Sequence, residues 1–171
     1  MCGYYTRFTG SFDISPAPDK KTRKLIHRLA KYPRIGYDTR CLAHLAGLNE
    51  SEVEERWGFE GEFFFPKRGV FRRNWWKKAE LNRPPGRQPD LLNYWEVNSS
   101  GHLEVISGEC DFYRYDEWLV YLRDFVFQPA GYSLSGCVSW QGENPDDVGR
   151  MIVLPNQVVK VERFGKPNQV F

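Results

Sequence analysis

Residues 131–162 constrain the fold of this chain more than any other stretch. Two runs rich in Val, Ile, Leu and Trp, residues 134–141 and 149–154, have the composition of β-strands and flank an acidic loop. Gly, Asn, Pro and Asp fill that loop, and these residues favour tight turns. A second turn at residues 155–157 leads into a further apolar run at residues 158–161. The stretch therefore predicts a meander of up to three strands.

The length and composition of the chain fit one hydrophobic core. It has 171 residues, of which 41% are hydrophobic and 16% aromatic, so we expect a single domain over residues 1–171. The four cysteines are far apart and form no CxxC pair, so neither a zinc knuckle nor a redox dithiol is indicated. We expect no metal and no cofactor. No apolar run approaches the roughly 20 residues of a bilayer-spanning helix. We expect a cytoplasmic protein without a membrane contact.

Strands and helices alternate along the rest of the chain. By their periodicity they are strands at residues 7–14, 91–97 and 102–106, and helices at residues 19–31 and 113–128. When an insertion of about residues 33–90 is left out, the order is β-α-β-β-α-β with an extra C-terminal strand. The sequence therefore predicts an α+β fold of the ferredoxin-like order, with an inserted αα-hairpin and a basic loop.

The αα-hairpin at residues 39–58 has the spacing of a helix-turn-helix. A recognition helix approaches DNA phosphates and needs basic side chains. The second helix here is acidic instead, with Glu50, Glu52, Glu54 and Glu55 against Arg56. We therefore interpret the hairpin as structural.

Residues 67–78, KRGVFRRNWWKK, form the most suggestive chemical patch. Basic residues without an acid among them are interleaved with aromatic rings. Phosphates bind Arg and Lys, and bases stack on aromatic rings, so the combination suits a nucleotide or a nucleic acid. The candidate ligand-binding residues are Lys67, Arg68, Arg72, Arg73, Trp75, Trp76, Lys77 and Lys78. The alternative is a solvated loop whose tryptophans pack in the core.

The acidic loop after residue 139 is a second candidate site. Its carboxylates could bind a cation or transfer protons, but they lack the ligand spacing of a calcium loop. Asp and Asn in tight loops usually hydrogen-bond their own backbone, which favours a turn-forming role. The candidate residues for contacts with a partner are Trp140, Gln141, Glu143, Asp146 and Asp147. GxSxG, HExxH and Walker motifs are absent from the sequence, so no catalytic residue is indicated.

Four segments of the sequence resemble a family of small proteins of bacteriophages and bacterial mobile elements. They are TGSFDISP (9–16), NRPPGRQPDLLNYW (82–95), FYRYDEWLVYL (112–122) and GCVSWQGENPDDVGRMIV (136–153). The resemblance spans most of the chain, although residues 67–78 are more basic here than we expect for the family. It implies a phage-borne accessory protein, of a kind that could blunt a host defence, and it implies no activity or residue roles.

The sequence thus favours a non-enzymatic accessory protein that binds an anionic partner through residues 67–78. That partner is a nucleotide signal or a complex that contains nucleic acid. One alternative is an inhibitor or adaptor of a host protein that uses exposed tryptophans and residues 140–147. A hydrolase that uses the acidic loop is the third interpretation. The oligomeric state is not indicated.

Overall fold

The chain divides into two compact units. The computed structural model describes residues 4–32, 34–36, 39–57, 62–64, 84–106, 112–164 and 169–170. Unit 1 comprises Met1–His27 and Asn93–Phe171, and unit 2 comprises Arg28–Leu92. Unit 2 contains the whole segment, about residues 33–90, that the sequence analysis treats as an insertion.

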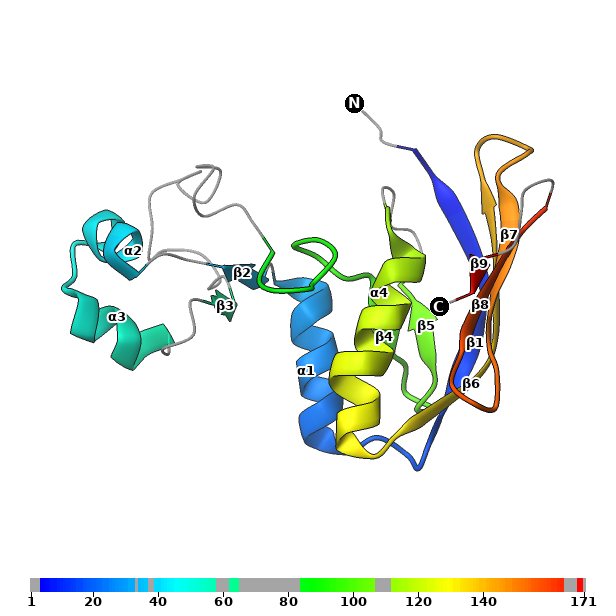
Figure 1. Ribbon diagram of the computed structural model, residues 1–171, viewed down its shortest axis with the longest axis horizontal. Coiled ribbons are helices and arrows are strands. Elements are labelled where there is room, and N and C mark those ends of the chain that lie inside the picture. The colour runs from blue at the N-terminus through cyan, green and yellow to red at the C-terminus, as the bar shows by residue number, and fades with distance from the viewer. Residues whose placement is uncertain are drawn as a thin grey trace. The chain divides into compact units, whose positions relative to one another are not determined.

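Unit 1 is built on an antiparallel sheet with the strand order β4-β5-β1-β6-β7-β8-β9. The strands are β1 (Thr6–Ser15), β4 (Trp95–Val97), β5 (Leu103–Val105), β6 (Ser133–Gly142), β7 (Val148–Val153), β8 (Val159–Arg163) and β9 (Gln169–Val170). The helix α4 (Tyr115–Leu122) and the unit 1 part of α1 (Lys20–Lys31) lie on the same face of this sheet (Figure 1). The predicted α+β class is therefore confirmed.

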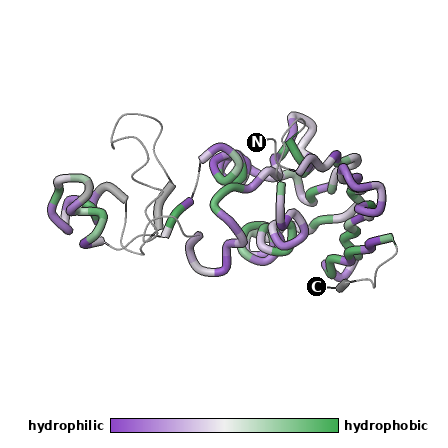
Figure 2. Tube along the Cα trace, turned by 90° about the horizontal axis from the view of Figure 1, so that it is seen from above, coloured by the Kyte–Doolittle hydropathy of each residue, from purple (hydrophilic) through white to green (hydrophobic). Residues whose placement is uncertain are grey.

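Strand alternation builds the core of unit 1. In β1, Phe12 is fully buried while its neighbour Asp13 is exposed, and the paired strand β6 buries Val138 and Trp140 on the same face. Helix α4 covers this face with Trp118, Leu119 and Leu122, all fully buried. Figure 2 shows the result along the trace of unit 1, where hydrophobic (green) and hydrophilic (purple) residues alternate. Phe12 and Ile14, two positions apart, are both buried, as alternation in the strand predicted at residues 7–14 requires.

The long β1–β6 pair depends on a glycine in each strand. Gly10 has φ +105°, and a Cβ there would lie 2.5 Å from the carbonyl oxygen of Cys137. Gly136 has φ +123°, and a Cβ there would lie 2.9 Å from the carbonyl oxygen of Ser11. L side chains rarely adopt such φ values, and the neighbouring atoms are backbone. Both positions therefore require glycine.

The segment after α4 differs from the continuous α-helix predicted for residues 113–128. Arg114, the residue before α4, has φ 58°, which is not a helical value, so α4 begins at Tyr115. The chain then changes to a π-helix over Arg123–Phe127 and a 3-10 helix over Gln128–Ala130. The π-helix and the 3-10 helix are five and three residues long, about one turn each, which is too short for the sequence pattern to reveal a change of period.

The terminal strand of the sheet, β4, is joined to β5 through Tyr94 and Asn98. The carbonyl of Tyr94 accepts a hydrogen bond from the N–H of Ile106 (2.9 Å), and the N–H of Asn98 donates to His102 (2.9 Å). In this register the N–H and C=O of Trp95 face away from β5. The side chain of Asn93, fully buried, binds both of them: its Oδ1 accepts from the Trp95 N–H (2.9 Å), and its Nδ2 donates to the Trp95 carbonyl (2.7 Å).

Unit 2 contains the predicted αα-hairpin, formed by α2 (Thr39–Ala46) and α3 (Glu50–Trp57). Asn49 and Glu52 exchange side-chain to backbone hydrogen bonds of 2.9 Å, a capping box that starts α3. A two-stranded sheet pairs β2 (Arg34–Gly36) with β3 (Glu62–Phe64). Across both units, none of the described helices is long and apolar enough to cross a membrane.

Candidate functional site

A pocket of about 630 Å³ lies in unit 1 beside the first turn of α4. Its walls come from the start of β1, the first turn of α4, the loop before β7 and the end of β8. This volume falls in the range of small-molecule sites, roughly 300–1,000 Å³. The lining residues are Tyr4, Thr6, Phe112, Tyr113, Arg114, Tyr115, Asp116, Glu117, Asp147 and Arg163.

Asp147, from the acidic loop, is held in the pocket wall by two neutral donors. Its Oδ2 accepts a hydrogen bond from the hydroxyl of Tyr4 (2.8 Å), and its Oδ1 accepts one from Nε1 of Trp140 (3.1 Å). Among the residues that the structure describes, no Lys, Arg or His forms an ion pair with Asp147. The carboxylate is thus fixed in direction while its charge stays without a counter-ion from these residues.

The register of the sheet positions Trp140 beneath Arg163. Trp140 of β6 pairs with Gly149 of β7, and Gly149 pairs with Arg163 of β8. Because Gly149 has no side chain, the indole of Trp140 can lie across it; a Cβ there would overlap the ring. The guanidinium carbon of Arg163 lies 5.7 Å from the centre of the Trp140 ring, a cation–π distance.

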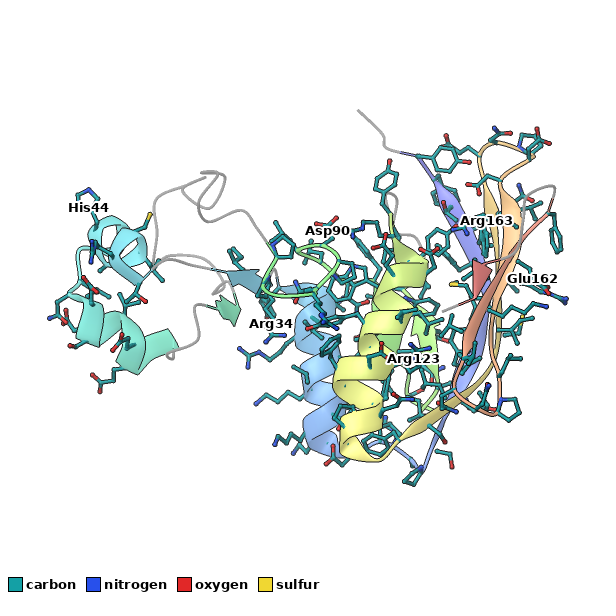
Figure 3. The ribbon with its side chains drawn as sticks, viewed as in Figure 1. Arg34, His44, Asp90, Arg123, Glu162 and Arg163 are labelled. Carbon is teal, nitrogen blue, oxygen red and sulfur yellow. The ribbon has the colours of Figure 1, made fainter. Side chains whose placement is uncertain are left out.

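Both arginines of the pocket are paired with carboxylates. Arg163 donates from Nη2 to Oδ2 of Asp116 (2.6 Å), and Asp116 is only 8% exposed. Figure 3 shows Arg163 on the α4 side of the sheet and its neighbour Glu162 on the opposite side, as strand alternation requires. Arg114 makes a bidentate contact with Glu117, with Nε–Oε1 and Nη2–Oε2 distances of 2.9 and 2.6 Å. This contact lowers the pKa of the Glu117 carboxyl.

Tyr115 lies at the base of an aromatic cluster. Its ring centre is 5.1 Å from that of Phe8, 5.2 Å from that of Trp140 and 6.1 Å from that of Phe112. Burial raises the pKa of the Tyr115 phenol, and the negative charges of Asp147 and Asp116 raise it further. The phenol therefore stays neutral near pH 7 and offers a hydrogen bond rather than a base.

Tyr4 joins the N-terminal segment to the acidic loop. Besides its bond to Asp147, the hydroxyl of Tyr4 accepts a hydrogen bond from the N–H of Asn144 (3.1 Å), and the backbone N–H of Tyr4 donates to the hydroxyl of Tyr113 (3.2 Å). Burial raises the pKa of the Tyr4 phenol, and the hydrogen bond to Asp147 adds to this effect. A Cβ on Gly142 would overlap both the Tyr4 hydroxyl and the Asp147 carboxylate, so the glycine makes room for their contact.

The acidic loop is a turn, as its composition predicted. The N–H of Asp147 donates to the carbonyl of Asn144 (2.9 Å), and the N–H of Asp146 donates to the Asn144 side chain (3.0 Å). Gln141, Glu143 and Asp146 are exposed, which leaves them accessible to a partner. Trp140 was also predicted to contact a partner, but it is only 2% exposed, and its indole N–H bonds Asp147 instead of facing solvent.

The sequence analysis missed most of the pocket. Of the residues it selected, Asp147 lines the pocket and Trp140 supports it. Tyr4 and Tyr113 carry no local signal, whereas Arg163 does: it continues the alternation of the buried Val159 and Val161, and a charge at a core-facing position calls for a partner.

The basic-aromatic segment lies outside the described residues. This applies to Lys67, Arg68, Arg72, Arg73, Trp75, Trp76, Lys77 and Lys78. The basic face of α1 is described, and its members Lys20, Lys24, Arg28 and Lys31 are all exposed. Their spacing along the helix places them on one side of it.

Comparisons with known proteins assign no function to these sites. No protein-family model, no curated protein and no solved structure matches the chain. In the described part of the chain, no group of three or more His, Cys, Asp or Glu side chains is arranged to hold a metal ion. The function is therefore inferred from the chemistry of the sites themselves.

Proposed function

We propose that the chain is a non-enzymatic binding protein and that the pocket beside α4 is its ligand site. The observation that carries this proposal is the fixed carboxylate of Asp147 in a cavity of ligand size lined by aromatic rings. Few, well-oriented polar groups among apolar walls are typical of small-molecule sites. Binding is favoured over catalysis because the two arginines are engaged by carboxylates and the Tyr115 phenol has a pKa far from neutrality.

Replacing Tyr113 with alanine should weaken ligand binding by roughly 2–10-fold, the size expected for one aromatic contact. Tyr113 is 53% exposed and lines the pocket, so its removal should leave the core intact. The measurement is an NMR fragment screen in which the indole N–H signal of Trp140 reports on the pocket. Phe125→Ala is the matched control, because Phe125 is 48% exposed and does not line the pocket.

Two results would contradict this proposal. Fragments could leave the Trp140 signal unmoved, or Phe125→Ala could reduce binding as much as Tyr113→Ala. Trp118 provides an internal reference, since its indole is buried and does not line the pocket.

A second candidate function is binding of an anionic partner, a nucleotide signal or a nucleic-acid-containing complex. The observation in its favour is α1, which has no acidic residue and presents Lys20, Lys24, Arg28 and Lys31 to solvent. The basic composition of residues 67–78 adds to this positive charge. Phosphate groups bind such clusters, and the binding weakens as salt rises.

The double variant Arg72→Ala/Arg73→Ala should weaken binding to single-stranded RNA and lower its salt dependence by about two counterions. Fluorescence anisotropy at several salt concentrations measures both quantities. Arg40→Ala/Arg87→Ala removes the same charge from two other exposed positions and should change neither. Equal losses in the two variants would show a general charge effect and would count against a site at residues 67–78.

We also propose that unit 1 has a ferredoxin-like arrangement extended by β7, β8 and β9. The strand order β4-β5-β1-β6, with α1 following β1 and α4 following β5, supports it. The family resemblance supports an accessory role in a phage or mobile element. A host protein as partner is the alternative for the exposed residues Gln141, Glu143 and Asp146.

A further inference from the structure

We propose that the ligand of the pocket carries an alkylammonium cation and that Asp147 is its counter-ion. This inference rests on the proposed function of the pocket and names the chemical class that the pocket accepts. Two independent properties of the lining support it, its charge balance and its aromatic rings.

The charge balance leaves one carboxylate for a ligand. Among the residues that the structure describes, the lining contains three carboxylates, on Asp116, Glu117 and Asp147, and two guanidiniums, on Arg114 and Arg163. Asp116 binds Arg163 and Glu117 binds Arg114, which neutralises four of the five charges. The two donors to Asp147 are a phenol and an indole, and these orient its charge without neutralising it. A cation is therefore attracted here, and an anion is repelled.

The aromatic rings favour a large, weakly hydrated cation. Tyr4, Phe112, Tyr113 and Tyr115 line the same cavity as Asp147. The face of an aromatic ring attracts cations, and quaternary ammonium groups are recognised by several such rings around an acidic or polar group. A metal ion is not favoured, because among the described residues no three His, Cys, Asp or Glu side chains are arranged to hold one. The aromatic rings, together with the Asp147 carboxylate that no cationic side chain of the described lining neutralises, thus fit an alkylammonium group.

A comparison of choline with 3,3-dimethylbutan-1-ol shows how much the ligand's charge contributes to its affinity. The two compounds have the same shape, because the alcohol has carbon in place of the charged nitrogen. We expect the wild-type protein to bind choline roughly tenfold more tightly than the alcohol, as one charge contact requires. NMR titration that follows the indole signal of Trp140 gives both dissociation constants. Raising the salt concentration should weaken the binding of choline and leave that of the alcohol unchanged.

Asp147→Asn should abolish the preference for choline and give similar affinities for the two compounds. The Tyr4 hydroxyl can turn to accept a hydrogen bond from the new amide, so the fold has a way to keep the loop in place. Asp146→Asn is the matched control, since it removes the same charge from an exposed neighbour that does not line the pocket. It should leave the choline preference intact.

The outcomes distinguish this inference from the function on which it rests. Equal binding of choline and the alcohol by the wild-type protein would overturn the cation and leave the pocket as a ligand site. Absence of binding by either compound, or shifts confined to other parts of the chain, would overturn both. A choline preference that survives Asp147→Asn would overturn the role of Asp147. The wild-type comparison decides the first two cases even if the Asp147 variant does not fold.

Discussion

Replacing Trp140 with alanine is expected to lower the free energy of unfolding by about 3–5 kcal/mol. The Trp140 side chain is 2% exposed. Its ring centre lies 5.2 Å from that of Tyr115, and the guanidinium of Arg163 lies over the ring. Its loss would leave a cavity between the sheet and the pocket, and would also remove a hydrogen bond to Asp147. Urea denaturation followed by circular dichroism gives the change in the free energy.

Trp140→Phe is the companion variant. It keeps an aromatic ring and removes the Nε1 donor to Asp147, so the expected loss is smaller, about 1–3 kcal/mol. An alanine variant as stable as the wild type would show that the ring is not part of the core. Such a result would restore the interpretation of Trp140 as a contact for a partner protein.

Replacing Gly10 with alanine is expected to cost about 2–4 kcal/mol of stability. Alanine would have to adopt φ near +105°, and its Cβ would lie 2.5 Å from the carbonyl oxygen of Cys137. Relief of this contact requires the two strands to separate locally, which breaks hydrogen bonds between β1 and β6. Thermal unfolding and urea denaturation both measure the loss.

Gly131→Ala separates the two causes of that loss. Gly131 also has positive φ, +81°, but a Cβ there would meet nothing within 4 Å. Its replacement should cost about 1 kcal/mol, from the backbone conformation alone. Equal losses at Gly10 and Gly131 would mean that the close approach of β1 to β6 contributes nothing.

The sequence predicted those parts of unit 1 that local patterns encode. Alternation of residue type along the chain indicated β1, and runs of Val, Ile and Trp around a turn indicated β6 and β7. The turn itself formed because Asn144 bonds the backbone of Asp146, which is a local property of Asn. Short strands such as β2 and β9 carry too few residues for a period to be detected.

The pocket could not be predicted in the same way, because its defining contact joins distant residues. Tyr4 and Asp147 are 143 positions apart, and they meet because β1 pairs with β6 along its full length. From the sequence the acidic loop therefore appeared as a turn and as a surface for contacts with a partner, and not as the wall of a pocket. The sequence pattern does not encode the register of the sheet. That register aligns Trp140 of β6, Gly149 of β7 and Arg163 of β8 side by side.

The side chain of Asn93 has a consequence for the behaviour of the protein in concentrated solution. A terminal strand with free N–H and C=O groups is a template on which a strand of another molecule can add, and this is a common route to aggregation. At β4 the outward-facing groups of Trp95 are both occupied by the amide of Asn93. A strand arriving there would first have to displace a buried side chain. The occupied backbone groups of Trp95, together with the charged residue Glu96 in the strand itself, therefore disfavour edge-to-edge self-association at β4.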